Sequence, residues 1–347
     1  MTGWKTAGSP ADVALTGLGT YTPAPTVSGA EVADRSGIPE EIVVEKMGLR
    51  EKHVCPPDAD HCTDMAVEAA RDALDDARIS PAAVDLLLYH GSEYKDHVVW
   101  SAAANIADRL GCEDAFATES YTLCAGAPVA IRQAKAQLLA DHVDTALLVA
   151  ASREEDLVDY ENEPASFMFN FGAGASAMVL ESDAPAERTC ATVRESAALT
   201  DGSFADDVVV PAGGSKLPPS VETVQQGLHS LDVPDHASMK ERLAEVSLPN
   251  FQEVARTAMD RSGVESVDFL ALTHVKRSFH ELLCDDLGCD PETDAYYLDD
   301  YGHVQSADQV LALSKGLSRG RVEAGDEVLF LAAGTGYTWA ATCLTWR

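Results

Sequence analysis

Apolar runs of strand length occur in two matched sets along the chain. VDLLLYHG at 84–91 is matched by VDFLALTH at 267–274 in the second half of the chain. VDTALLVAAS at 143–152 is matched by GDEVLFLAAG at 325–334, at nearly the same spacing. Short apolar runs bounded by polar residues indicate buried strands. Two matches at nearly the same spacing predict that a structural unit is duplicated.

The stretches around these strands are matched as well. The first strand of each set leads into a helical stretch that ends in Leu-Gly-Cys, as DRLGC at 108–112 and as DDLGC at 285–289. A short strand and a second helix follow in each half, and the sets close on GAGASAMVLES at 172–182 and GYTWAATCLTW at 336–346. The pattern predicts an α/β fold in which a strand–helix–strand–helix–strand–strand unit occurs twice.

The duplication divides the chain into two halves, residues 1–183 and residues 184–347. Between the two sets, residues 201–236 contain glycines and prolines and show little periodicity, so we expect a loop over a pocket. Helical spacing returns at 237–263 and is broken near Pro249. We expect the apolar face of this segment to lie in the core rather than along a ligand tunnel.

The charge balance excludes several functions. The chain of 347 residues carries 57 acidic and 25 basic residues, a formal net charge of −32. Such a surface repels phosphate backbones and anionic membranes. No leader pattern opens the sequence, and no apolar run approaches the roughly 20 residues that a membrane span needs. We expect a cytoplasmic protein that binds neither nucleic acid nor membranes.

The eight cysteines form no CxxC pair, so neither a zinc ribbon nor a thioredoxin-like motif is indicated. The densest group of possible metal ligands is His53, Cys55, His61 and Cys62, in KHVCPPDADHC. Their spacing is not that of a standard zinc site, and we interpret the segment as a surface loop without a metal.

Cys124 occupies a position at which packing alone does not require a thiol. It lies between a polar strand end and a predicted helix start in ESYTLCAGAPVAIRQAKAQLL at 119–139. The spacing of the two matched sets makes it the equivalent of Ser306, at the corresponding helix start of the second half. If the halves pack about a pseudo-twofold axis, these helix starts bring Cys124, His303 and His274 together. A thiol, two imidazoles and two helix N-termini in one place predict a nucleophilic site.

Four motifs carry a resemblance to a known family. They are VALTGLGTYTPAPTVSGAEV near the start, MGLREKHV at 47–54, FGAGASAMVL at 171–180 and the closing GTGYTWAATCLTW. In this order and spacing they resemble the β-ketoacyl-acyl-carrier-protein synthase III branch of the thiolase superfamily, over nearly the whole chain. The resemblance implies a thiolase-like fold, in which two βαβαβ halves give five layers in the order α-β-α-β-α.

The resemblance also implies an activity. The Cys124 thiolate takes an acyl group from a thioester of coenzyme A or of an acyl carrier protein, and no cofactor is bound. The N–H of Cys124 and another from the turn of Gly334, Thr335 and Gly336 hold the oxyanion. His274 serves the second half-reaction, a decarboxylative Claisen condensation in fatty-acid, polyketide or specialised metabolism.

One departure from the family pattern leaves the second half-reaction open. His303 stands where the family has asparagine, and His274 with His303 can supply the donors that condensation needs. Asp308 can instead orient His274 or His303 in a Cys–His–Asp relay, as in relatives that transfer an acyl group to oxygen or nitrogen without condensation. His280 is the alternative to His274 if the alignment shifts. A catalytically silent partner subunit is the third possibility, and an intact Cys124 argues against it.

The predicted binding surface departs from the family as well. Ile42 stands where the family has the tryptophan that stacks on adenine, and Lys46 stands where it has an arginine. The basic dock that an acidic carrier protein needs is predicted at Lys276 and Arg277.

The resemblance implies a homodimer, in which a loop of one protomer closes the pocket of the other. This loop is predicted at 96–102, with Val99 and Trp100 facing the neighbour's tunnel. Ala333 stands in place of the family phenylalanine beside the glycine turn, which predicts a roomier pocket floor.

Overall fold

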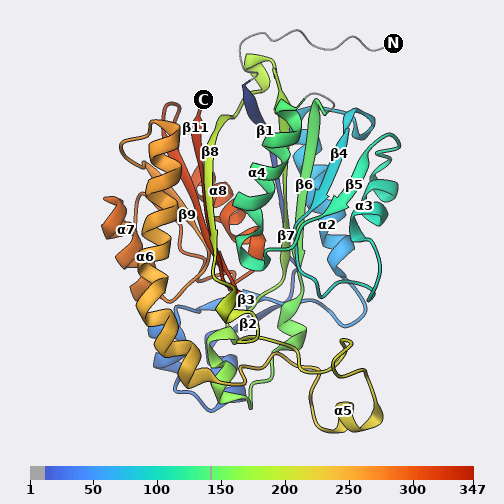
Figure 1. Ribbon diagram of the computed structural model, residues 1–347, viewed down its shortest axis with the longest axis vertical. Coiled ribbons are helices and arrows are strands. Elements are labelled where there is room, and N and C mark those ends of the chain that lie inside the picture. The colour runs from blue at the N-terminus through green and yellow to red at the C-terminus, as the bar shows by residue number, and fades with distance from the viewer. Residues whose placement is uncertain (1–11, 141–142) are drawn as a thin grey trace.

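The protein is described by a computed structural model over residues 12–140 and 143–347 (Figure 1). Within these residues the strands are β1 (Val13–Tyr21), β2 (Thr26–Ser28), β3 (Glu51–His53), β4 (Leu86–Tyr89), β5 (Phe116–Glu119), β6 (Thr145–Ser152), β7 (Gly174–Ser182), β8 (Ala191–Thr200), β9 (Phe269–Leu272), β10 (Glu327–Gly334) and β11 (Thr338–Trp346). The α-helices are α1 (Gly29–Ser36), α2 (Cys62–Ala77), α3 (Ala102–Leu110), α4 (Gly126–Leu139), α5 (Val221–Gln225), α6 (His236–Ser262), α7 (Arg277–Leu287) and α8 (Asp308–Ser318).

The main sheet has the strand order β5-β4-β6-β7-β1-β8-β11-β10-β9. Its two halves meet where β1 runs antiparallel to β8, and only two residue pairs join them there, Ala14 with Thr192 and Leu15 with Ala191. On the β1 side, β4 is parallel to β5 and β6, and on the β8 side β9 is parallel to β10. The sheet therefore consists of two half-sheets with matching topology and a narrow junction.

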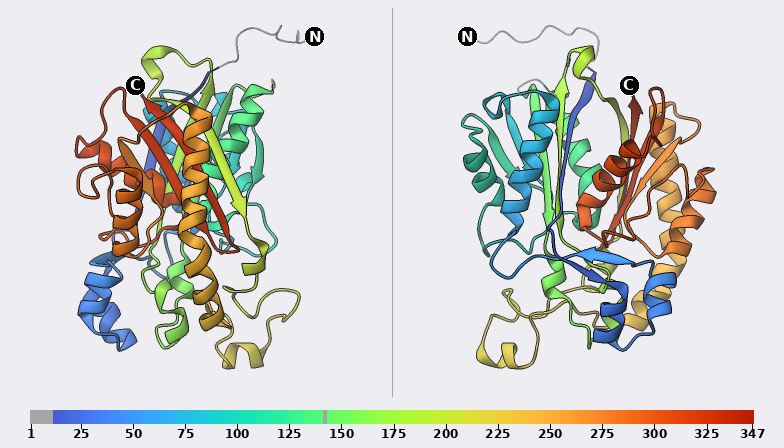
Figure 2. Two further views of the ribbon diagram at one scale, coloured as in Figure 1. Left: turned by 60° about the vertical axis from the view of Figure 1, so that its left-hand side comes forward. Right: turned by 180° about the vertical axis from the view of Figure 1, so that it is seen from behind.

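Helices fill the space between the half-sheets and cover both outer faces (Figures 1 and 2). Alternation along β4 shows how: Leu86 and Leu88 pack inward with α4 and α8, whereas Leu87 and Tyr89 pack outward with α2 and α3. In the second half, α6 and α7 pack on the outer face of β9 and β10. In order, the five layers are α2 with α3, the first half-sheet, α4 with α8, the second half-sheet, and α6 with α7. The predicted five-layer α/β fold is confirmed.

The repeated Leu-Gly-Cys signal ends a helix in each half. Gly111 follows α3 and Gly288 follows α7, with φ of +81° and +77°, the left-handed conformation that glycine adopts at low cost. The next residues, Cys112 and Cys289, are buried and donate their backbone N–H groups back into the last turn of each helix. These cysteines help to end helices, and their thiols have no evident chemical role.

The second half lacks a full counterpart of β5. The short strand predicted after Cys289 is reduced to one isolated bridge, between Leu270 and Ala295. Just beyond it, the aromatic ring of Tyr296 packs beneath Arg319 and Arg321. The chain therefore pairs with β9 at one point only and is then held against α8 and the turn that follows it.

The helix break predicted near Pro249 is wrong. α6 runs without interruption from His236 to Ser262, and Pro249 lies inside it. Proline removes one backbone hydrogen bond, but the helix buries Phe251 and Val254 against the second half-sheet. Tertiary packing maintains the helix, and its expected place in the core is confirmed.

The predicted boundary at residue 183 falls in the connection between β7 and β8. The two halves share the middle layer, because one hydrophobic cluster includes residues from α4, α8 and strands of both half-sheets. The division into two units stays a prediction, and residues 1–11 of the first unit lie outside the described residues. Within the described part of the chain, no helix combines the length and the hydropathy required to cross a membrane.

Candidate active site

The starts of α4 and α8 are built alike. Each helix is preceded by a short 3₁₀ helix, η3 (Leu123–Ala125) before α4 and η8 (Gln305–Ala307) before α8. The first residue of each has an unusual left-handed conformation, with φ of +51° at Leu123 and +55° at Gln305. Cys124 and Ser306 follow at equivalent positions, so the predicted equivalence of the two helix starts is confirmed.

The two helix starts touch each other in the middle layer. The Ser306 hydroxyl donates a hydrogen bond to the carbonyl oxygen of His90, at 2.8 Å. A Cβ atom on Gly126 would lie 2.6 Å from the same oxygen and 2.7 Å from the Ser306 Cβ. Gly126 therefore has to be glycine for α4 and α8 to start side by side.

Cys124, His303 and Asp308 form one hydrogen-bonded chain. The Cys124 Sγ lies 3.0 Å from Nε2 of His303, and Nδ1 of His303 lies 2.6 Å from Oδ2 of Asp308. All three side chains are buried. The predicted convergence of Cys124 and His303 is present in the structure, and the site consists of a thiol, an imidazole and a carboxylate in line.

Protonation of His303 is governed by these two neighbours. Burial opposes the charged imidazolium, but the charges and hydrogen bonds of Asp308 and Cys124 outweigh burial and raise the pKa of His303 well above its usual range. A protonated His303 beside the thiol favours a thiolate–imidazolium pair, the reactive form of a nucleophilic cysteine. Cys124 also lies at the N-terminal end of α4, where the helix dipole favours negative charge.

The backbone of His303 is held by the start of the FGAGASAMVL motif and the residue before it, a contact that the motif did not indicate. Its N–H donates to the carbonyl of Asn170 at 2.8 Å, and its own carbonyl accepts from Gly172 at 3.0 Å. Beneath this segment the buried ammonium of Lys52 donates to the carbonyls of Phe169 and Phe171, at 2.8 and 2.6 Å. Burial lowers the pKa of Lys52 to about 7. Lys52 belongs to the motif MGLREKHV, but the motif did not indicate that this side chain lies beneath the segment that holds His303.

His274 reaches the same carboxylate through its backbone. Its N–H donates to Oδ2 of Asp308 at 2.7 Å, while both ring nitrogens are buried and have no hydrogen-bond partner among the described residues. The ring packs against Tyr297, with 4.8 Å between ring centroids. Burial, and then the charges of His303 and other neighbours, lower the pKa of His274 well below its usual value. His274 is therefore a neutral imidazole.

His280, the alternative to His274, lies inside α7 and also packs on Tyr297, edge-on and with 4.9 Å between ring centroids. Burial lowers its pKa to about 4. Because Asp308 contacts His274 and His303, the structure favours His274 as the residue beside the reaction centre.

The glycine turn lies directly against Cys124. A Cβ atom on Gly334 would lie 2.2 Å from the carbonyl oxygen of Thr122 and 3.0 Å from the backbone nitrogen of Cys124. Gly336 has a φ of +126°, so the loop of Gly334, Thr335 and Gly336 between β10 and β11 depends on glycine. The backbone N–H of Cys124 and this turn are adjacent, and their role as an oxyanion hole stays a prediction.

The predicted cations lie on the surface. Lys46 ends a short π-helix (Ile42–Lys46) and is exposed, as is Lys276 before α7. The guanidinium of Arg277 is bound to Asp299 at 2.8 Å and lies over the ring of Tyr297. Its charge is therefore already paired, which weakens the case for a basic dock at that place.

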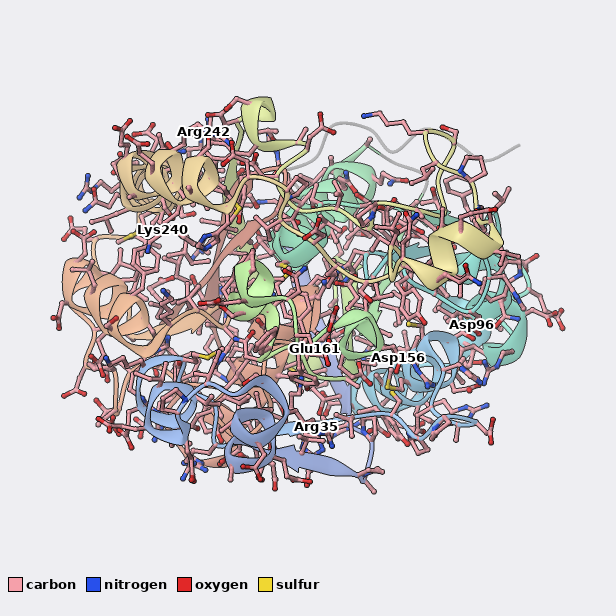
Figure 3. The ribbon with its side chains drawn as sticks, turned by 90° about the horizontal axis from the view of Figure 1, so that it is seen from below. Arg35, Asp96, Asp156, Glu161, Lys240 and Arg242 are labelled. Carbon is pink, nitrogen blue, oxygen red and sulfur yellow. The ribbon has the colours of Figure 1, made fainter. Side chains whose placement is uncertain are left out.

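Charged side chains also lie at the lower end of the molecule, near η4 (Glu154–Leu157), which follows β6. Figure 3 shows this end from below, with Asp156 and Glu161 near the centre. Lys240 and Arg242 lie on α6 at one side (Figure 3), and the Arg242 guanidinium binds both oxygens of Asp207 at 2.7 and 2.6 Å. This face carries both signs of charge.

The predicted partner loop projects from the fold only in part. Val98 and Val99 are 85% and 99% exposed, and Val99 has a φ of +54°. Trp100, by contrast, is half-buried and packs against the core beneath α2 and α3, with its ring edge-on to His97. Trp100 thus packs partly on its own protomer, and the place of Val99 and Trp100 in a neighbour's pocket stays a prediction. Ala333, the predicted pocket floor, is half-buried against the outer core of the second half.

The four possible metal ligands in the first half bind protein groups in different directions. His53 bonds the carbonyl of Pro23 at 2.7 Å, and the Cys55 thiol donates to the carbonyl of Asp60 at 3.2 Å. The Cys62 thiol donates to the carbonyl of Tyr94 at 3.1 Å, and His61 lies against Arg153. Over residues 12–140 and 143–347, no group of three or more such side chains is placed to hold a metal ion.

The site lies within two segments that match known families. Residues 119–202, which include Cys124, match the family described as 3-Oxoacyl-[acyl-carrier-protein (ACP)] synthase III. Residues 259–346, which include His274, His303 and Asp308, match the family described as 3-Oxoacyl-[acyl-carrier-protein (ACP)] synthase III C terminal.

The similarity extends over nearly the whole length of a relative in sequence and of two solved structures in fold. The chain is 27% identical over 339 residues to a β-ketoacyl-[acyl-carrier-protein] synthase III of Solibacter usitatus, covering 96% of this chain and 98% of the relative. The crystal structure of a 3-oxoacyl-[acyl-carrier-protein] synthase III from Aquifex aeolicus has a TM-score of 0.81 at 21% identity, covering 96% and 100% of the two chains. The priming β-ketosynthase of the R1128 polyketide pathway has a TM-score of 0.82 at 23% identity, covering 96% of each chain. The chain therefore belongs to the β-ketoacyl-acyl-carrier-protein synthase III-like branch of the thiolase superfamily.

Proposed function

We propose that this protein takes an acyl group from a thioester onto Cys124 and extends it by decarboxylative condensation. The observation that carries the proposal is the contact of 3.0 Å between the Cys124 thiol and Nε2 of His303, at the N-terminal end of α4. The family assignment supports the same chemistry, because the curated relatives are named β-ketoacyl-acyl-carrier-protein synthases III. The acyl donor is a thioester of coenzyme A or of a carrier protein.

In the first half-reaction the Cys124 thiolate attacks the thioester carbonyl. The negative charge that develops on the carbonyl oxygen is met by the N–H of Cys124 and by the turn beside it that begins at Gly334. The carbon–sulfur bond to the donor breaks, and the imidazolium of His303 supplies the proton for the departing thiolate. The products are a neutral acyl-enzyme on Cys124 and a free thiol.

In the second half-reaction a malonyl thioester loses carbon dioxide, and the electron pair of the broken carbon–carbon bond forms an enolate. His303 first regains a proton at Nε2 from solvent, because Asp308 raises its pKa. Two N–H donors then stabilise the enolate oxygen, one from His303 and one from His274. The ring of His274 suits this role, because its nitrogens are free of other partners among the described residues and its low pKa keeps it neutral. The enolate carbon attacks the acyl carbonyl, and the thiolate of Cys124 leaves.

A second function is favoured by one specific contact. Nδ1 of His303 is bound to Asp308 at 2.6 Å, which completes a Cys–His–Asp relay of the kind that activates nucleophiles. With the acyl group on Cys124, His303 can take a proton from a hydroxyl or an amine, which then attacks the acyl carbon. This alternative is an acyltransferase that forms an ester or amide and releases no carbon dioxide. The intact chain from Cys124 to Asp308 argues against a catalytically silent partner subunit.

Incubation with acyl and malonyl thioesters tests the proposal. We expect the intact mass to rise by one acyl group after mixing with an acyl-CoA or an acyl-carrier thioester. We expect labelled carbon dioxide when malonyl-CoA or a malonyl carrier labelled in the free carboxyl is then added. An acyl adduct without labelled carbon dioxide would contradict condensation and support acyl transfer, and no adduct with either donor would contradict both functions.

We also propose a homodimer located in the cytoplasm. The strand β5 lies at the outer edge of the sheet, and its Phe116 is 63% exposed. Together with the exposed Val98 and Val99, this edge presents unpaired backbone groups and apolar area to a second copy. Light scattering at micromolar concentration should give twice the mass of one chain, and a monomer would contradict the pairing.

A further inference from the structure

Glu154 is a buried carboxyl group that the mechanism above leaves unused. It is the first residue of η4, two residues beyond the end of β6, and it is only 7% exposed. A buried carboxylate is costly unless it is hydrogen-bonded or paired. Its contacts therefore indicate what the fold gains from placing it there.

Two side chains from distant parts of the chain bind this carboxyl. The hydroxyl of Ser92 donates to one oxygen at 2.5 Å, and the side-chain amide of Gln305 donates to the other. Ser92 begins the loop after β4 that leads to the exposed Val99, and its hydroxyl also accepts the backbone N–H of Tyr94 at 2.9 Å. Gln305 lies between His303 and Asp308 in sequence. One carboxyl thus joins the loop after β4 to the turn that carries His303.

The pseudo-twofold repeat shows that the turn itself does not require this contact. Leu123 is the counterpart of Gln305 and has the same left-handed conformation, with φ of +51° against +55°. An apolar side chain is thus sufficient for the conformation in the first half. The polar pair of Gln305 and Glu154 joins the two halves, and it forms at the helix start that follows His303 rather than at the one that carries Cys124.

Charges close to Glu154 link its ionisation to that of His303. Burial raises the pKa of Glu154 to about 7, against the effects of the Ser92 hydrogen bond and of His303, which lower it. The other charged groups that act on it are Glu93, on the loop after β4, and Glu155, the next residue in η4. His303 is the cation among these groups, so an ionised Glu154 favours a protonated His303.

The residues around Glu154 can accommodate its ionised form and its neutral form. The Oε1 atom of Gln305 is buried without a hydrogen-bond partner among the described residues. If the Gln305 amide rotates, this oxygen can accept the proton of a neutral Glu154, and the present orientation serves the ionised form. Neither state leaves Glu154 itself unsatisfied.

We propose that Glu154 is a positioning residue of the Cys124–His303 pair, coupling the loop after β4 to the turn before α8 through one shared carboxyl. When ionised, it adds a second negative charge, besides that of Asp308, to the surroundings of the imidazolium. The thiolate–imidazolium pair is then favoured, and protonation of Glu154 removes this support. The inference rests on the proposed roles of Cys124 and His303.

The test is the pH dependence of Cys124 alkylation by iodoacetamide, read by peptide mass on the full-length protein. We expect an inflection near the pKa of Glu154 in the wild-type profile and its loss in Glu154→Gln, which has a similar shape and can keep both hydrogen bonds. Above that inflection the variant should react about tenfold more slowly, the change that one pKa unit of coupling produces. Glu154→Asp should retain the inflection, because it keeps the charge.

Glu93→Gln is the matched control, since it removes one exposed negative charge from the same neighbourhood. It should leave the profile within about twofold of the wild type. A Glu154→Gln profile equal to the wild type, even with a lowered melting temperature, would show a structural role only and overturn the proposal. The assay needs no acyl donor, so a failure of the proposed condensation would be seen separately, as missing carbon dioxide.

If Glu154→Gln does not fold, Gln305→Leu tests whether Glu154 acts on the Cys124–His303 pair. It copies Leu123, which adopts the same backbone conformation, and it detaches Glu154 from the turn without removing the carboxyl. A fall of about threefold or more in alkylation at neutral pH, with the fold intact, supports the coupling. An unchanged profile would overturn it.

Discussion

Replacing Cys124 by alanine should abolish the acyl adduct and lower turnover by about 10⁴-fold or more, as expected when a covalent nucleophile is lost. The thiol is the only group at the start of α4 that can form a thioester with the substrate. The change should cost little stability, because a buried thiol and a methyl group are both small and apolar. Intact mass after mixing with an acyl thioester measures the adduct, and carbon dioxide release or product formation measures turnover.

Cys55→Ala is the matched control for this prediction. Cys55 is more exposed than Cys124, but burial raises the pKa of its thiol. The same cause raises the thiol pKa at Cys62, Cys112, Cys190, Cys284, Cys289 and Cys343. Cys124 should therefore be alkylated first under limiting iodoacetamide. An adduct that persists in Cys124→Ala, or an activity that disappears with Cys55→Ala, would refute its assignment as the nucleophile.

Asp308→Asn should lower turnover by about 10³- to 10⁴-fold, the size of effect seen when the carboxylate of a catalytic relay becomes an amide. One carboxylate accepts three N–H groups here: the ring of His303, the backbone of His274 and the backbone of Val304. An asparagine offers one oxygen and turns an amide toward at least one of these donors. The variant should therefore also be less stable, by about 1 to 3 kcal/mol.

The effect of Asp308 on the pKa of His303 predicts how stability and the reactivity of Cys124 change with pH. Burial lowers the pKa of His303, and Asp308 is the largest of the influences that raise it, so loss of Asp308 should let the imidazolium deprotonate at lower pH. The stability that this raised pKa contributes is fully present below the unfolded pKa of histidine, about 6.5, and is lost as the pH rises through the folded value. In Asp308→Asn this contribution should shrink, and Cys124 should react more slowly with iodoacetamide near neutral pH.

Asp64→Asn is a suitable control, because Asp64 also accepts a backbone N–H in the first turn of a helix, α2, but lies away from Cys124. It should leave the alkylation profile unchanged. If Asp308→Asn alkylates as the wild type does, His303 does not depend on Asp308 and the relay is wrong. His303→Asn separates the two functions. Some condensation should remain, because the amide of the family residue can still donate an N–H to the enolate oxygen, whereas acyl transfer should be lost, because an amide cannot take a proton from the acceptor.

Much of the fold could be read from the sequence because its signals are local. Apolar runs of strand length, the Leu-Gly-Cys helix ends and the nearly constant spacing between matched segments are all visible in the chain. They correspond to the strands, caps and equivalent helix starts of the structure. The predicted helix break at Pro249 was wrong because tertiary packing, which is not local in sequence, decided the outcome there. A local helix breaker was overridden by the burial of Phe251 and Val254 on the second half-sheet.

Fold class, duplication and the candidate nucleophile Cys124 could all be predicted from the chain alone, because periodicity, helix ends and motif order depend on residues that are near one another in sequence. The connections within the site became visible only once the chain was folded. Asp308 binds the ring of His303 but only the backbone of His274, and Arg277 is occupied by Asp299. The place of Glu154 was identified from its contacts with Ser92 and Gln305, both of which are distant from it in sequence. Which partner a polar side chain meets depends on how distant segments pack, and no local pattern encodes that choice.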